Sequence, residues 1–112
     1  MKKIEAIIRP EKLDSVRAAL EEVGFPGVMI TEIEGHGKQK GITQQWRGKK
    51  YRVELLPKVK IEIIVHDQDV EKIMESIAKK AMTGKIGDGK IFVYPVEDAL
   101  RIRTDERGDK AI

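Results

Sequence analysis

Six stretches with periodic hydrophobic residues constrain the fold of this chain more than any other feature. Ile4, Ala6 and Ile8 occupy every second position, and the same alternation is clearest from Val59 to Val65, as in a half-buried β-strand. Leu13, Val16, Leu20 and Val23 instead recur every three or four residues, which is the period of a helix. The patterns predict strands at 3–9, 28–35, 59–66 and 90–96, and helices at 10–23 and 70–81.

The ends of the two predicted helices carry residues that begin or stop helices. Pro10 begins the first, and Gly24 followed by Pro26 ends it. Asp67 or Asp69 is expected to be the N-cap of the second helix, which ends before a Gly-rich segment.

The order of these elements indicates an α+β fold of the ferredoxin-like βαββαβ type, in one domain covering residues 1–112. Such a fold has a four-stranded antiparallel sheet with both helices on one face. The strand 90–96 is apolar on both faces, which predicts a central position in the sheet. Ile7, Ile64 and Phe92 would point to the helix-free face, so we expect other subunits to cover that face.

Composition excludes several classes of protein. The 112 residues include no cysteine, which excludes disulfides, a thiol nucleophile and cysteine-containing zinc sites. No apolar run reaches the ~18 residues of a membrane span, and Lys2 and Lys3 precede a strand rather than a signal-type stretch. We therefore expect a soluble cytoplasmic protein without membrane insertion. The polar tail 105–112 has the composition of a disordered segment.

The connection 37–57, between the second and third predicted strands, is much longer than the ~2 to 5 residues that a hairpin needs. Six basic residues and a single acidic one give it a net charge of +5, although the whole chain carries only +3. Trp46, Arg47 and Tyr51 have the composition of an interface anchor. The alternative is a hairpin whose strands extend further and whose Trp46 packs back on the body.

Two further segments favour anion binding. Gly84, Gly89 and Lys90 match part of a P-loop, but Ile91 replaces the magnesium-binding Ser or Thr and a strand follows, so this is not a Walker A site. Glycines still let backbone N–H groups converge on a phosphate, although a helix C-cap followed by a turn is the alternative. Arg101 and Arg103, on alternate residues of an extended segment, would present two guanidiniums on one side. The two segments could meet across a subunit boundary.

No catalytic constellation is evident. His36 and His66 lie at predicted strand ends without carboxylates at ligand spacing, and we interpret them as edge residues. An acylphosphatase-like hydrolase on this fold would need an asparagine, and the chain contains none. An RNA-binding module would need aromatic residues on the sheet, for which Phe92 and Tyr94 are the candidates.

The same segments resemble those of the PII family of nitrogen-regulatory signal proteins, over residues 1–112. Residues 3–10 resemble the opening strand of the family. Residues 37–41 and 56–62 resemble the two roots of its T-loop (about 37–57), residues 82–90 its B-loop, and residues 101–104 its C-loop.

The resemblance implies a homotrimer with ATP or ADP in each cleft between subunits. Around the base it would place Ile7, Met29, Gly35 and Ile64, and around the phosphates Gly37, Lys38, Gly87, Gly89 and Lys90 of one subunit with Arg101 and Arg103 of its neighbour. His36, Glu62, Ile63, Asp88 and Ile102 would complete the nucleotide site.

The resemblance also implies a magnesium ion and the effector 2-oxoglutarate. Gln39 would coordinate Mg²⁺ together with the ATP phosphates. The expected 2-oxoglutarate site consists of Gly37, Gln39, Lys40, Gly41 and Lys58, with the Lys58 ammonium on the distal carboxylate.

Regulation would follow from a shift among T-loop conformers that partners recognise. The partners implied are an ammonium channel, nitrogen-assimilation enzymes and regulators, contacted through Trp46, Arg47 and Tyr51, and not nucleic acid. Tyr51 matches a tyrosine that is uridylylated in many members, here in a more basic flank. The protein itself would not be an enzyme.

Overall fold

The predicted four-stranded antiparallel sheet is present in the computed structural model, which describes residues 1–37, 43–46, 49–52 and 54–112. Its strands are β1 (Lys2–Ile8), β2 (Met29–Gly37), β5 (Glu54–Val65) and β6 (Lys90–Pro95), in the order β2-β5-β1-β6. Ile4 pairs with Ile63 on one side and with Val93 on the other. This α+β arrangement confirms the predicted fold class.

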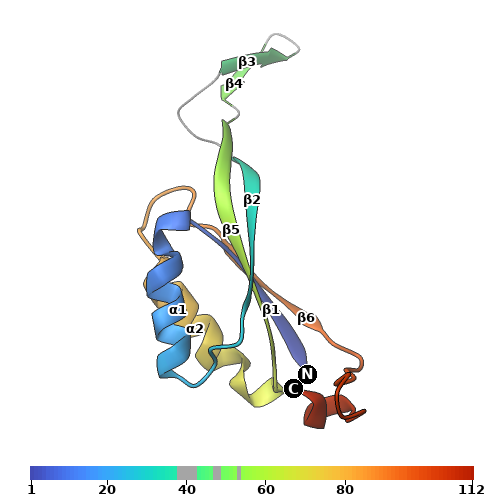
Figure 1. Ribbon diagram of the computed structural model, residues 1–112. Coiled ribbons are helices and arrows are strands. Elements are labelled where there is room, and N and C mark those ends of the chain that lie inside the picture. Colours follow the sequence, from blue (N-terminus) through green and yellow to red (C-terminus); the bar gives the residue numbers. More distant parts are fainter. Residues whose placement is uncertain (38–42, 47–48, 53) are drawn as a thin grey trace.

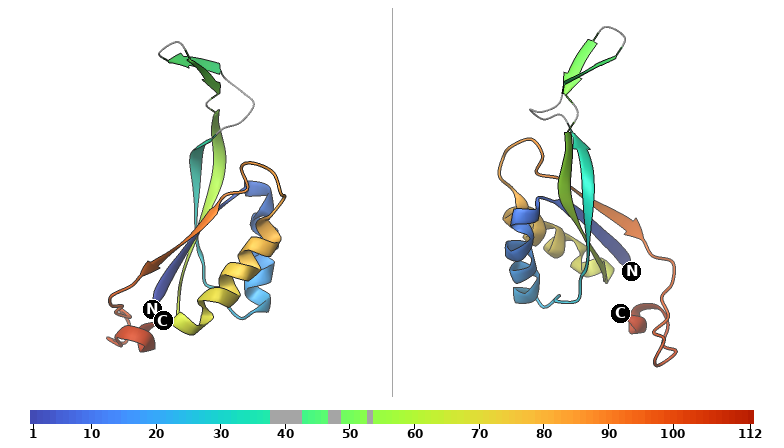
Figure 2. Two further views of the ribbon diagram at one scale, coloured as in Figure 1. Left: turned by 180° about the vertical axis from the view of Figure 1, so that it is seen from behind. Right: turned by 45° about the horizontal axis from the view of Figure 1, so that its top comes forward.

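Two antiparallel helices cover one face of the sheet (Figure 1). They are α1 (Leu13–Glu22), preceded by the 3-10 turn η1 (Pro10–Lys12), and α2 (Val70–Ala81), preceded by the 3-10 turn η2 (Asp67–Asp69). The opposite face carries no helix in either view of Figure 2. Within the described part of the chain, no helix is both long and apolar enough to cross a membrane.

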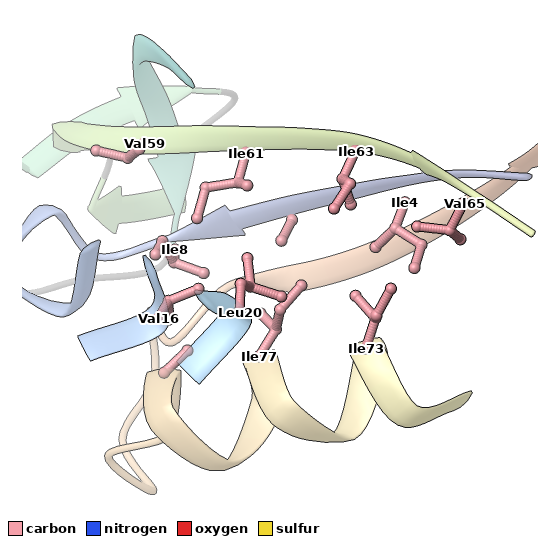
Figure 3. Close-up of a cluster of buried hydrophobic side chains, with 12 residues drawn as sticks. Ile4, Ile8, Val16, Leu20, Val59, Ile61, Ile63, Val65, Ile73 and Ile77 are labelled. Atoms are coloured by element: carbon pink, nitrogen blue, oxygen red, sulfur yellow. The ribbon is translucent and has the colours of Figure 1, made fainter. Parts of the chain in front are cut away.

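The core lies between the sheet and these helices (Figure 3). Period-two alternation sends Ile4, Ile61 and Ile63 to the helical side, where at most 4% of each remains exposed. Ile73 and Ile77 of α2 meet them and are fully buried. Each such side chain stabilises the fold by roughly 1.5–3 kcal/mol relative to exposure. The alternation in the sequence therefore predicts the core face correctly.

The predicted end of α1 is confirmed, and the predicted cap of α2 is correct in position, at Asp69, but makes no side-chain hydrogen bond to the helix. Gly24 adopts φ +90° and its N–H donates to the Glu21 carbonyl, while the Phe25 N–H donates to the Leu20 carbonyl at 2.8 Å. This is a Schellman C-cap, which glycine favours. Neither Asp67 nor Asp69 caps α2 with its side chain.

Asp67 forms an ion pair with the N-terminus instead of a helix cap. Its carboxylate lies 3.0 Å from the N-terminal ammonium of Met1, which lowers the pKa of Asp67. Asp69 instead pairs with Lys72 at 3.7 Å. The N-terminal ammonium, which tertiary folding brings close to Asp67, thus binds a carboxylate that was expected to cap the helix.

The prediction that 90–96 forms a central strand is wrong, because β6 is an edge strand that pairs only with β1 in the described sheet. Phe92, Val93 and Tyr94 are 44, 39 and 42% exposed. In this strand, apolar residues on both faces do not indicate a second neighbouring strand. They indicate that both faces of β6 remain partly exposed.

The connection between the second and third core strands is shorter than the predicted 37–57. β2 and β5 stay paired up to Gly37 and Glu54, so the strands extend beyond the sheet core. A separate two-stranded ribbon, β3 (Thr43–Trp46) paired with β4 (Lys49–Arg52), lies within the connection. The extended-hairpin alternative is thus correct for the backbone; where the Trp46 side chain packs lies outside the described side chains.

The tail is ordered, contrary to the expectation of disorder. Leu100 bridges to Arg107, and a 3-10 turn, η3 (Gly108–Ala111), follows. Asp109 of that turn lies 3.7 Å from the Nδ1 atom of His66 and 4.0 Å from the N-terminus. These long-range polar contacts hold a segment whose composition alone suggests a mobile end.

Candidate functional site

The B-loop, between α2 and β6, is closed by one carboxylate. Asp88 accepts hydrogen bonds from the Thr83 N–H at 2.8 Å, from the Gly84 N–H at 2.9 Å and from the Thr83 hydroxyl. The Arg9 Nε also donates to it at 3.2 Å. These donors, the Thr83 hydroxyl foremost, hold the pKa of Asp88 far below its ordinary value. Asp88, a predicted site residue, therefore shapes the loop.

Glycine is required where the B-loop meets the sheet. Gly87 and Gly89 adopt φ +101° and +105°, a region that other residues rarely enter. A Cβ atom on Gly89 would lie 1.7 Å from the Ile7 carbonyl oxygen. The loop backbone is thus packed directly against the end of β1.

Two cations from the sheet bind carbonyl groups of the B-loop. The Arg9 Nη2 donates to the Ile86 carbonyl at 2.8 Å, and the Lys58 Nζ donates to the Gly87 carbonyl. Lys58 belongs to β5, the strand that leaves the T-loop. The structure therefore brings a residue predicted for 2-oxoglutarate next to a loop predicted for phosphate.

A hollow of about 310 Å³ lies beside the B-loop. Four of the residues that line it are predicted site residues: Ile7, Asp88, Gly89 and Lys90. The rest of its wall is mainly apolar, from the end of α2 and from the neighbouring strands. The predicted B-loop residues thus border a concave surface rather than a flat one.

The residues predicted for the nucleotide site divide between the two faces of the sheet. Ile7, Glu62 and Ile64 share the helix-free face, as the register of β1 with β5 shows. Met29, paired with Glu62, joins them and is 56% exposed. Ile63 instead is 4% exposed in the core, so it can reach a ligand on that face only through its backbone.

Charged groups also lie on the helix-free face, which the apolar residues alone did not indicate. The Lys3 Nζ lies 3.3 Å from Glu62 and 3.7 Å from Glu5, and 4.7 Å from the centre of the Tyr94 ring. The Glu62 carboxylate raises the pKa of Lys3 above its ordinary 10.5. Phe92 and Tyr94, the aromatics of the RNA-binding alternative, do lie on this face, but the Tyr94 ring contacts the Lys3 ammonium.

The C-loop is a turn and not the predicted extended segment. The Thr104 N–H donates to the Arg101 carbonyl at 3.3 Å, and Asp105 adopts φ +59°. The Arg101 guanidinium lies 3.1 Å from the Glu106 carboxylate, whereas Ile102 is 94% exposed. Arg101 and Arg103 therefore do not form a fork by strand alternation; Glu106 sets the direction of one of them.

The B-loop and the C-loop lie at opposite ends of β6 (Figure 1). Lys90 pairs with Ile7 at one end of β1, and Pro95 pairs with Lys2 at the other. Six strand residues span ~17 Å, and five more residues precede Arg101. The structure does not bring the two anion-seeking segments of one chain together.

The T-loop residues are only partly described. Gly35, His36 and Gly37 end β2, and Trp46 and Tyr51 lie in the ribbon, all as backbone positions. The predicted roles of Lys38, Gln39, Lys40, Gly41 and Arg47 fall outside the described residues.

Sequence reasoning considered Arg9 only as a phosphate-holding residue of the acylphosphatase-like alternative, and it missed the contacts of Arg9 with the B-loop and of Glu106 with the C-loop. Arg9 contacts residues 77 and 79 positions away, which no local pattern encodes. For Thr83 a signal existed, because a threonine next to glycine is typical of a turn in which the hydroxyl accepts from the N–H two residues on, as it does here from Lys85 at 3.2 Å.

Comparison with known proteins agrees along the whole chain. The family model described as Nitrogen regulatory protein P-II matches residues 1–106. A Nitrogen regulatory protein P-II from Rhodospirillum rubrum is 58% identical over 112 residues, and the P-II 1 protein of Escherichia coli K12 is 57% identical, with both chains covered completely in each case. The P-II 2 protein of Methanothermobacter thermautotrophicus is 56% identical over all of this chain and 97% of its own. These relatives are named as regulators and not as enzymes, and the chain belongs to the nitrogen regulatory protein P-II family.

Proposed function

We propose that this protein senses ATP, ADP and 2-oxoglutarate and regulates proteins of nitrogen assimilation through its T-loop. The regulatory role follows the names of relatives that match it from end to end. The identities of the ligands follow from the family resemblance, and the charge and backbone geometry of the B-loop support an anionic ligand there.

The observation that carries this proposal is the hydrogen bond from Lys58 to the Gly87 carbonyl. It joins the strand that leaves the T-loop to a Gly-rich loop suited to phosphates. A ligand that displaces either Lys58 or the Gly87 carbonyl would alter the environment of the other group. That is the physical connection a sensor needs between its ligand and the loop its partners recognise.

The chemistry of the B-loop suits a polyanion. Two glycines at positive φ allow backbone amides to converge on an anion, and Lys58, Lys90 and Arg9 contribute positive charge nearby. Asp88 is the acidic group among them; Arg9 compensates its charge, and hydrogen bonds from Thr83 and Gly84 stabilise the ionised carboxylate. A nucleoside diphosphate or triphosphate fits this donor set, and its base would lie on the sheet beside Ile7.

The separation of the two anion-seeking segments favours a site between subunits. Arg101 and Arg103 lie at the far end of β6 from the B-loop, so a neighbouring chain would supply them. We propose the trimer on this ground, together with the exposed Met29 and Phe92 on the helix-free face. A closed ring of three copies would cover three such faces and form three equivalent clefts.

Gln39 would hold Mg²⁺ with the nucleotide phosphates, and the Lys58 ammonium would donate to the distal carboxylate of 2-oxoglutarate. The Lys58 ammonium can serve because it is partly buried and lies at the edge of the B-loop. The bound metal would supply a positive centre that joins the nucleotide to the effector.

Isothermal titration tests the proposal directly. The purified protein is titrated with ATP, with ADP, and then with 2-oxoglutarate in the presence and absence of Mg²⁺ and ATP. We expect both nucleotides to bind and 2-oxoglutarate to bind only with Mg²⁺ and ATP present. Absence of nucleotide binding would overturn the proposal, and binding of 2-oxoglutarate without nucleotide would overturn its coupling.

A further inference from the structure

Arg9 makes contacts that the proposed ligand site does not yet explain. It follows β1 directly, its side chain is 20% exposed, and both of its hydrogen bonds reach the B-loop. Its Nε donates to Asp88 at 3.2 Å and its Nη2 to the Ile86 carbonyl at 2.8 Å. One guanidinium thus fixes a side chain and a backbone group of the same loop.

Fixing a carbonyl also fixes an amide. In a trans peptide, the C=O of one residue and the N–H of the next point in opposite directions. The bond from Arg9 to the Ile86 carbonyl therefore directs the Gly87 N–H away from Arg9, and the bond from Lys58 to the Gly87 carbonyl directs the Asp88 N–H away from Lys58. Successive amides directed to one side of a loop form an anion-binding nest.

We propose that Arg9 is a positioning residue, which holds the B-loop amides in the orientation that binds the phosphates of a nucleoside diphosphate or triphosphate. Arg9 acts through the Ile86 peptide and through Asp88, and it need not touch the ligand. This inference rests on the proposed function, because it concerns the same phosphate site.

The guanidinium geometry is essential to this role. Two donors separated on a planar fork reach two acceptors at once, which a single ammonium group does not reproduce. Arg9→Lys keeps the positive charge and removes the fork, while Arg9→Gln removes both. Arg17, exposed on α1, provides the matched control Arg17→Gln.

The experiment compares ADP with adenosine. ADP affinity is measured by isothermal titration and adenosine affinity by nuclear magnetic resonance titration, for the wild type and the three variants, after thermal unfolding has shown which variants fold. Arg9→Gln should weaken ADP binding about tenfold and leave adenosine binding within about twofold, because only the phosphates use the oriented amides. Arg9→Lys should retain most of the loss, and Arg17→Gln should match the wild type.

The outcomes separate the possible roles of Arg9. Unchanged ADP affinity in Arg9→Gln overturns the inference, and so does an equal loss for ADP and adenosine, which indicates a merely structural role. Full recovery in Arg9→Lys also overturns it, because charge alone would then suffice. Should Arg9→Gln fail to fold, the ratio of ADP to adenosine affinity in Arg9→Lys decides. A wild type that binds no ADP overturns the proposed function itself, whereas a binding wild type with a normal Arg9→Gln overturns only the inference.

Discussion

Gly89 shows how strictly a single position is determined by its backbone. Its φ of +105° is strained for any L side chain, and the space that a Cβ would need is occupied by the Ile7 carbonyl oxygen. The close approach brings the B-loop onto the end of β1. The same absence of a side chain that lets the chain turn also lets the loop reach the sheet.

Gly89→Ala should therefore destabilise the fold by more than about 2 kcal/mol, because neither the φ angle nor the backbone contact can be kept. Urea unfolding measures the loss. The control is Gly27→Ala, where a Cβ would meet nothing within 4 Å, and it should leave stability unchanged or slightly raised. Equal stability of the two variants would contradict the strained position of Gly89.

Asp88 makes the stability of the B-loop depend on pH. Thr83, Gly84 and Arg9 donate to its ionised form and lower its pKa below the ordinary 3.8. A carboxyl group with a depressed pKa contributes stability that is present above its unfolded-state pKa and is lost as the pH falls toward its folded-state pKa.

The stability difference between the wild type and Asp88→Asn should accordingly be constant near neutral pH and shrink as the pH falls below 3.8. Urea unfolding of both proteins between pH 7 and pH 2.5 measures this difference. A difference that does not change across that range would show that the ionised carboxylate contributes nothing.

Among the secondary-structure elements, the period-two strands and the stripe of α2 were predictable because local spacing alone decides which face is buried. Ile61 and Ile77 meet in the core as their spacing indicates. The position of β6 was not predictable in this way, since Phe92 and Tyr94 look the same in sequence whether a strand or solvent lies beside them. Which strand pairs with β6 depends on the topology of the whole sheet and not on the sequence of β6 alone.

In the loops too, some features were predictable from local sequence and others depend on tertiary contacts. Glycines and lysines marked the B-loop, but its closure by Asp88 and its anchoring by Arg9 depend on contacts made after folding. In the C-loop, alternation predicted an extended pair of arginines, and a turn stabilised by Glu106 formed instead. A short polar segment has no hydrophobic face to fix its conformation, so side-chain hydrogen bonds decide it.

Considered as a whole, the molecule has two unlike faces. The helical face is packed into a core, while the helix-free face combines exposed Met29 and Phe92 with the ion pairs of Lys3, Glu5 and Glu62. The B-loop and the C-loop lie at opposite ends of that sheet (Figure 2). In the proposed trimer, the B-loop of one chain would meet the C-loop of its neighbour.

This arrangement predicts complementation between two defective variants. Lys90→Ala removes a cation at the B-loop, and Arg103→Ala removes one at the C-loop, so each variant alone should bind ADP poorly in every cleft. When the two are co-expressed and trimers that contain both variants are selected, about a third of the clefts should combine an intact B-loop with the neighbour's intact C-loop, because each mixed ring of three has one such cleft. Isothermal titration of oligomers purified through two different affinity tags should then show a fraction of sites with wild-type affinity, and each variant prepared alone is the control. If both segments served one nucleotide within a single chain, mixing would restore no site, and the proposed cleft between subunits would be wrong.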